Sequence, residues 1–147
     1  MPRIDLAAVA QSDRTGYPPE YAGAVAGRWV RRLGPASGLS QFGVSHVVLK
    51  PGAASSQRHW HEEEDEFVVL LSGEAVLIDD GGRVPMRAGD MAAFPKGDGN
   101  GHHLVNESGE DCVFLAVGRV PEGKAHYPDI DMQWTGSVYL RKDGSSF

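Results

Sequence analysis

Cysteine, excess basic charge and long apolar runs are all scarce in this sequence. Its 147 residues include a single cysteine, Cys112, so no disulfide can form within the chain. The apolar neighbours of Cys112 in "DCVFLAVG" predict a buried core thiol rather than a nucleophile. No stretch approaches the roughly 20 apolar residues of a membrane span. The apolar run from Leu6 to Ala10 is too short for the core of a signal peptide. We therefore expect a cytoplasmic protein with no membrane partner.

Acidic residues outnumber basic ones. The chain has 14 Lys and Arg against 20 Asp and Glu, a formal net charge of −6. A surface of this charge repels phosphate groups, which argues against nucleic acids and anionic membranes as partners.

Turn-forming residues are abundant, with 19 Gly and 9 Pro. Between residues 41 and 120 the sequence reads as about eight short strands, with turn signals about every 8–12 residues, as in β-sandwiches and barrels. "FGVSHVVLKPG" is typical of a strand that ends at Pro-Gly. "EFVVLLSGEAVLIDDGG" predicts two strands, with a hairpin turn at Asp79–Gly82. The length and these strands predict one all-β domain.

Both ends of the chain leave the strand pattern. We expect residues 1–35 to be an N-terminal extension with a short helix near Glu20–Ala26, and residues 36–120 to form the barrel. Residues 121–147 form a tail rich in large apolar side chains, which we expect to pack on the barrel or on a partner subunit. These side chains are Tyr127, Trp134, Tyr139 and Phe147.

The stretch "RHWHEEEDEF" predicts a metal site. Residues two apart on a strand point to one side, so His59 and His61 share a face and Trp60 lies on the other. Glu66 would point away on an unbroken strand. The run Glu62–Asp65, which we expect to be solvated loop charges, can form a turn that brings Glu66 back to the same rim. Two imidazoles and a carboxylate are suitable ligands for a divalent ion.

A second histidine cluster lies downstream in "GNGHHLVN". Either His102 or His103 could supply a fourth ligand from another strand. On a strand the two side chains point to opposite faces, so they cannot both do so.

Two segments resemble the motifs of the cupin superfamily. "GAASSQRHWHEEEDEFVVLLSG" resembles the first motif, with an insertion after its first glycine; its matching residues are Gly52, His59, His61, Glu66 and Gly73. "GDMAAFPKGDGNGHHLVN" resembles the second, with a longer loop than usual before the histidine; its matching residues are Gly89, Pro95, Gly97, His102 and Asn106. Together with the tail "HYPDIDMQW", they also resemble a group of small bacterial single-domain cupins, some of them called sugar-phosphate-isomerase-like.

The resemblance implies a single-domain jelly-roll barrel, the double-stranded β-helix, with extensions at both ends. It implies a homodimer, and "FVVLLSG" fits a strand with one face in the barrel and one against a partner. It also implies one divalent metal ion per chain, held by His59, His61, Glu66 and His102. His103 stays an alternative to His102.

This mixed nitrogen and oxygen set suits Fe, Mn, Ni, Co or Zn. Open positions on such an ion allow a metal-dependent isomerase, lyase or dioxygenase acting on a small polar metabolite. No acid–base pair is evident in the sequence. His46 and His103 are candidates, although His46 also fits a hydrogen-bonded barrel histidine. The alternative is therefore a non-catalytic module that binds or senses a small molecule together with its metal.

Overall fold

Short antiparallel strands are the main regular structure in a computed structural model, which describes residues 2–119 and 122–147. The strands are β1 (Gln11–Ser12), β2 (Arg28–Arg32), β3 (Gly43–Leu49), β4 (Trp60–His61), β5 (Glu66–Ser72), β6 (Glu74–Asp79), β7 (Gly82–Arg87), β8 (Met91–Phe94), β9 (His103–Val105), β10 (Cys112–Gly118), β11 (Ala125–Tyr127), β12 (Met132–Trp134) and β13 (Tyr139–Leu140). The predicted hairpin is confirmed, because β6 and β7 pair from Glu74 and Arg87 to Asp79 and Gly82.

The helices are short. They are α1 (Pro19–Ala22), α2 (Leu33–Ala36) and the 3₁₀ turns η1 (Leu6–Ala8) and η2 (Gly23–Val25). The predicted helix near Glu20–Ala26 corresponds to α1 and η2. Pro19 suits the first position of α1, because its missing N–H would have no partner there. Among the described residues, no helix has the length and apolar character needed to cross a membrane.

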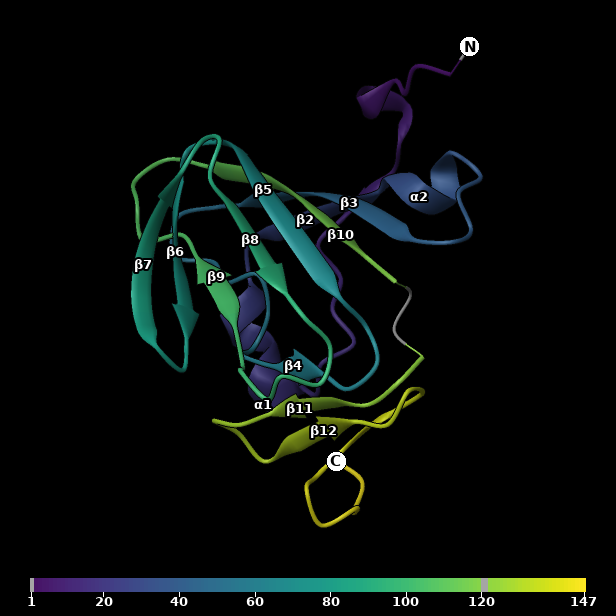
Figure 1. Cartoon of the computed structure of the whole chain (residues 1–147), viewed down its shortest axis with the longest axis vertical. Helices are drawn as coiled ribbons and strands as arrows, with labels where there is room; N and C mark the ends of the chain where they lie inside the picture. The colour runs from purple at the N-terminus through teal and green to yellow at the C-terminus, as the bar shows by residue number, and fades with distance from the viewer. Residues whose placement is uncertain (1, 120–121) are drawn as a thin grey trace.

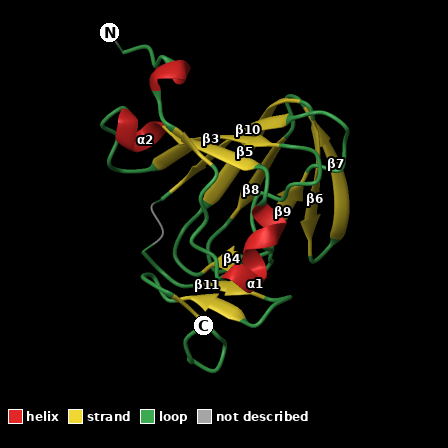
Figure 2. Cartoon of the chain, turned by 180° about the vertical axis from the view of Figure 1, so that it is seen from behind, coloured by secondary structure: helices red, strands yellow, loops and turns green. Residues whose placement is uncertain are grey.

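Three sheets form the molecule (Figure 1). The largest has the strand order β1-β2-β3-β10-β5-β8, a second has β7-β6-β9, and a third has β13-β12-β11-β4. The first sheet extends closer to the N-terminus than the predicted barrel start at residue 36, since β2 pairs with β3 over five residues. The third sheet joins the C-terminal segment to β4 at one end of the molecule, and α1 lies at that end in both views (Figures 1 and 2).

The main core lies between the first two sheets, as a jelly roll requires. Its buried residues come from alternate positions on both sheets: Val47, Leu49, Val68, Leu70, Cys112 and Phe114 from the larger, Ala75, Met86 and Leu104 from the smaller, and Ala53 from a loop. The expected buried thiol is confirmed, and burial raises the pKa of Cys112 to about 11. A reactive cysteine would need the opposite shift.

The outer face of β5 and β8 carries exposed apolar side chains. On β5, Val68 and Leu70 point into the core, so Phe67 and Leu71 point outward. Their exposed fractions are 39% and 48%, and that of Met91 on the neighbouring β8 is 64%. These three residues form one outer apolar patch.

Gly73 fixes the turn between β5 and β6. Its φ is +75°, a left-handed conformation that favours glycine. A Cβ at this position would collide with the carbonyl oxygen of Asp111 and lie 2.9 Å from Cα of Cys112, so β10 would have to move. Gly52 has a similar φ of +87°, but its Cβ would meet nothing within 4 Å.

We expect Gly73→Ala to lower the free energy of unfolding by about 3 kcal/mol or more, because it combines backbone strain with a collision against backbone. Gly52→Ala is the matched control and should cost about 1 kcal/mol, from the left-handed conformation alone. Urea denaturation of both variants measures the difference. Equal losses would show that the close approach at Gly73 does not contribute to stability.

Candidate metal centre

Four side chains from three segments of the chain meet at the end of the jelly roll nearest the third sheet. His59 and His102 lie opposite each other in an antiparallel bridge. The His59 amide donates to the carbonyl of His102 at 3.2 Å, and the His102 amide donates back at 2.9 Å. His61 lies on β4 and Glu66 begins β5. The turn between them brings Glu66 to the same side as His59 and His61, as expected from the sequence.

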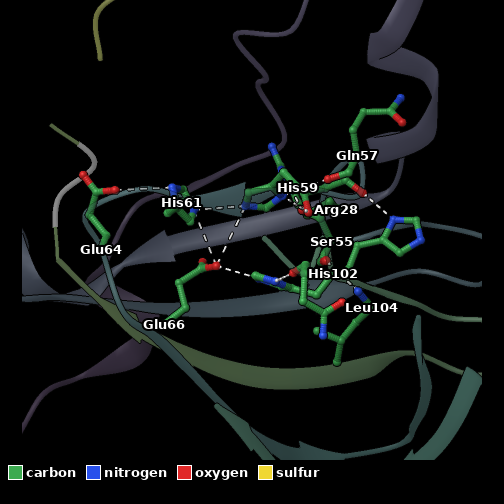
Figure 3. A network of polar contacts seen from close by, with 12 residues as sticks. Arg28, Ser55, Gln57, His59, His61, Glu64, Glu66, His102 and Leu104 are labelled. Carbon is green, nitrogen blue, oxygen red and sulfur yellow. Dashed lines mark hydrogen bonds and ion pairs between the residues drawn. The ribbon is translucent and has the colours of Figure 1, made fainter. Parts of the chain in front are cut away.

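Three imidazoles converge on one carboxylate oxygen of Glu66 (Figure 3). Oε2 of Glu66 lies 2.7 Å from Nε2 of His102, 3.5 Å from Nε2 of His61 and 3.8 Å from Nε2 of His59. His59, His61 and Glu66 offer ligand atoms that all lie within 4.8 Å of one another, an arrangement that could hold a metal ion. His102 contacts the same carboxylate, whereas Nδ1 of His103 lies 2.9 Å from the carbonyl oxygen of Ser56.

The donor set fits a divalent cation. Nε2 of His59 and Nε2 of His61 face each other at 3.1 Å, beside the Glu66 carboxylate. Without a cation, only a proton between the two nitrogens relieves the repulsion of their lone pairs. A cation would satisfy both lone pairs and the carboxylate together.

Contacts on the far side of each ring orient His59 and His102. Nδ1 of His59 lies 2.8 Å from the carbonyl oxygen of Gln57, so it carries the hydrogen and leaves the Nε2 lone pair facing the cluster. The ring of Tyr127 stacks on His59, with centroids 5.4 Å apart. The ring of Phe94 stacks on His102 at 3.6 Å. Each aromatic ring covers one face of a histidine ring and keeps water away from it.

Burial and proximity shift the pKa values of the cluster. Burial would raise the pKa of Glu66, but the hydrogen bonds to His102 and His61 and the nearby imidazoles outweigh it and hold this pKa well below its usual value. Burial lowers the pKa of His59 from 6.5 to about 4. For His61, burial acts in the same direction, but contact with Glu66 and the charges of Glu66 and Glu64 raise its pKa overall.

One acidic residue of the loop contradicts the sequence expectation. Glu62, Glu63 and Asp65 are exposed, as expected for solvated charges, but Glu64 is only 3% exposed. Its Oε1 accepts hydrogen bonds from the backbone amides of Glu122 and Gly123 at 2.8 and 2.6 Å. The C-terminal segment therefore buries Glu64.

Neither candidate base reaches the cluster. Val47 and Leu49 point into the core, so His46 lies on the outer face of β3. Its Nδ1 is buried without a hydrogen-bond partner, so the expectation of a hydrogen-bonded barrel histidine is wrong for this atom. His103 bonds to backbone instead.

The cluster is closed on most sides. The side chains of His59, His61 and His102 are 11%, 10% and 7% exposed, whereas that of Glu66 is 30% exposed. A small molecule would therefore approach from the side of Glu66. A cavity of about 500 Å³ lies elsewhere, between β6, β7 and residues 107–108, and none of the four side chains lines it.

Comparison with known proteins identifies the fold family. Residues 45–118, half of the chain, match the family model described as the cupin domain. This chain is a cupin. The match confirms the resemblance seen in the sequence and the predicted jelly-roll fold, and it contains both histidine segments.

Two solved structures resemble this cupin. A structure from Silicibacter pomeroyi DSS-3, described as a sugar phosphate isomerase from the cupin superfamily, is 48% identical; the alignment covers 99% of this chain and 96% of that one, with a TM-score of 0.93. A structure from Thermotoga maritima, described as a predicted oxalate decarboxylase, is 31% identical over 63% of this chain and 79% of that one, with a TM-score of 0.55.

A curated relative matches over a shorter segment. The oxalate-binding protein of Thermotoga maritima is 39% identical over 73 residues, which are 50% of this chain. The chain covers 58% of the length of that protein.

The pKa shifts predict that the metal-free protein loses stability in acid. His59 has a pKa of about 4 in the folded protein and 6.5 when unfolded, so the unfolded state binds more protons between these values. The contribution of His59 to the free energy of unfolding is fully present above pH 6.5. It falls by about 3 kcal/mol as the pH drops to 4. Glu66 adds to the loss at still lower pH, because its folded pKa is also depressed. His61 has a raised pKa in the folded protein, so its protonation favours the folded state as the pH falls and offsets part of this loss.

Urea unfolding of chelator-treated protein between pH 8 and pH 4 measures this loss. His59→Gln should flatten the dependence between pH 6.5 and 4, because it removes the buried titrating group. An unchanged slope in His59→Gln would refute the role of His59.

Proposed function

We propose that this cupin is a metal-dependent enzyme that acts on a small polar metabolite, with isomerase, lyase or dioxygenase chemistry. The observation that carries the proposal is the convergence of three imidazole nitrogens on the Glu66 carboxylate, whose side chain is 30% exposed.

The proposed ligands are His59, His61, Glu66 and His102, holding one Fe, Mn, Ni, Co or Zn ion per chain. The geometry supports His102 over His103, since Nε2 of His102 contacts Glu66 whereas His103 contacts Ser56. A bound ion of this kind polarises a carbonyl group or lowers the pKa of bound water. Four protein ligands leave about two positions of a six-coordinate ion for substrate or water.

The chain's own residues leave one side of the cluster for a substrate. The histidines are nearly covered and Glu66 is partly exposed, so we expect a substrate to approach beside Glu66. Phe94 and Tyr127 hold two histidine rings from behind, which fixes their direction before a substrate arrives. Among the three reaction types, the near full-length similarity to the Silicibacter pomeroyi protein favours isomerisation of a phosphorylated sugar.

A second candidate is a module that binds a small anion at its metal without turnover. The similarity to an oxalate-binding protein favours it. In the described part of the chain, neither His46 nor His103 reaches the cluster as a base, which is also consistent with binding alone.

We expect purified protein to contain about one divalent ion per chain, and the double variant His59→Ala/His61→Ala to lose it. Elemental analysis measures the content. We expect wild type loaded with that ion to interconvert aldose and ketose phosphates, and the double variant to lose this activity by 100-fold or more, on the order of other losses of metal ligands.

His126→Ala is the matched control, because this histidine stacks on Trp60 and contacts Glu62 away from the cluster. It should keep both metal and activity. Folded wild type that takes up no added metal would overturn the metal site. Metal-loaded protein that turns over no sugar phosphate, yet is stabilised by oxalate, would replace the enzyme with the binding module.

We also propose a cytoplasmic homodimer that has no nucleic-acid or membrane partner. The outer apolar patch of Phe67, Leu71 and Met91 supports a second copy as the partner, because large exposed apolar groups side by side mark interaction surfaces. The net charge of −6 is consistent with the absence of nucleic-acid partners.

Light scattering after size exclusion should give twice the 15.8 kDa mass of the chain. Leu71→Glu should shift the protein to monomer, because it places a charge within the covered patch. Val84→Glu is the control: Val84 is 53% exposed but lies on β7 of the other sheet. A monomeric wild type, or equal dissociation by both variants, would contradict this interface.

A further inference from the structure

Glu64 is a buried carboxylate with two different neighbours. Its side chain is 2% exposed, and in residues 2–119 and 122–147 no lysine or arginine forms an ion pair with it. A buried charge without such a partner is costly, so what it contacts must compensate. One oxygen, Oε1, is compensated by the backbone amides of Glu122 and Gly123.

The other oxygen faces a proposed metal ligand. Oε2 of Glu64 lies 3.5 Å from Nδ1 of His61, and both atoms are buried without a hydrogen-bond partner (Figure 3). The opposite nitrogen of the same ring, Nε2, faces Glu66 at 3.5 Å. The imidazole of His61 therefore lies between two carboxylates, one on each side of the ring.

A cation at the cluster decides between the two nitrogens of His61. A carboxylate oxygen lies on each side of the ring, and Nε2 also faces Nε2 of His59 at 3.1 Å. With a cation on Nε2, the hydrogen lies on Nδ1, where Oε2 of Glu64 can accept it. His59 achieves the same tautomer with a backbone carbonyl, that of Gln57. Glu64 is the side chain that can do this for His61.

We propose that Glu64 is a positioning residue: it holds His61 in the Nδ1–H tautomer and, through its second oxygen, couples the metal site to the C-terminal segment. The proposal rests on the metal site of the proposed function, but not on turnover.

The coupling has a continuous path. The amides of Glu122 and Gly123 bind Glu64, and two residues later Ala125 begins β11, which pairs with His61 on β4. The Glu62 amide also donates to the carbonyl of Lys124 at 3.0 Å. Anything that fixes Glu64 and His61 must therefore also stabilise the contacts of this segment. By linkage, metal binding should protect these amides by the same factor as an attached segment strengthens metal binding.

Two substitutions separate the two roles of Glu64. Glu64→Gln keeps an oxygen for the amides of the C-terminal segment but turns an NH₂ group toward Nδ1, which makes Nδ1 an acceptor and moves the hydrogen to Nε2. Glu64→Ala removes both contacts. Glu62→Gln is the matched control, because Glu62 lies in the same loop but contacts the partly exposed His126.

The first readout is the ¹⁵N spectrum of the His61 ring in zinc-loaded protein at about pH 8.5, where an ordinary histidine is neutral. We expect zinc on Nε2 and the hydrogen on Nδ1 in wild type and Glu62→Gln, and loss of this pattern at the same zinc concentration in Glu64→Gln. The second is zinc affinity by competition with a chelator. We expect a loss of about 10–100-fold in Glu64→Gln, as for other residues that orient a metal ligand, and none in Glu62→Gln.

The third readout is hydrogen exchange of the Gly123 amide. Zinc should slow it in wild type, and Glu64→Ala should speed it up and abolish the response to zinc. An unchanged tautomer and zinc affinity in Glu64→Gln, with wild type binding zinc, would overturn the role of Glu64. Wild type that binds no metal, but whose Gly123 amide exchanges more slowly than in Glu64→Ala, would overturn the proposed metal site and leave the contact of Glu64 with the C-terminal segment standing.

Discussion

The antiparallel bridge between His59 and His102 is the contact on which the cluster depends. Its two hydrogen bonds join segments that are far apart in the sequence, and they place two imidazoles side by side with backbone accuracy. Glu66 is then added from β5, whose register against β10 is fixed by core residues on both strands. Backbone pairing therefore holds all four proposed ligands: Glu66 in the largest sheet, His61 in the third sheet, and His59 and His102 in their bridge. Sites held in this way keep their geometry without a ligand, which lowers the cost of binding one.

The same closeness creates an electrostatic problem that the fold does not solve with protein groups alone. Three imidazoles surround one carboxylate, and burial disfavours every charged form. The outcome is uneven: the pKa of Glu66 is depressed, that of His59 falls to about 4, and that of His61 rises. The pKa values of neighbouring groups in this cluster are therefore shifted in opposite directions. A shared cation compensates the charges and lone pairs of such a cluster better than any fixed set of protons does. Such arrangements are more typical of functional sites than of cores selected for stability.

Periodicity, together with the resemblance to the cupin motifs, was sufficient to predict which four side chains come together, but not what surrounds them. Alternation along a strand placed His59 and His61 on one face, and the polar run before Glu66 showed where the parity could change. Glu64 was misread because its solvation is decided by amides of residues 122 and 123, which no local pattern connects to it. Tyr127 and Phe94 were missed for the same reason, although an aromatic tail and a phenylalanine before Pro95 were visible. The face of His46 was left open because "GVSHVVL" is apolar on both sides, so that alternation could not decide which side is buried.

The C-terminal segment determines how far family membership describes this site. The family match ends at residue 118, yet Tyr127 stacks on His59 and the amides of Glu122 and Gly123 hold Glu64. The matched region thus contains the four proposed ligands, whereas part of what surrounds them lies outside it. A metal can be inferred from the shared region, because ligand type and spacing decide it. A substrate cannot, because the shape and polarity of the pocket depend on the surrounding residues. A relative that shares the C-terminal segment is therefore a better guide to the reaction than one that shares only the two motifs.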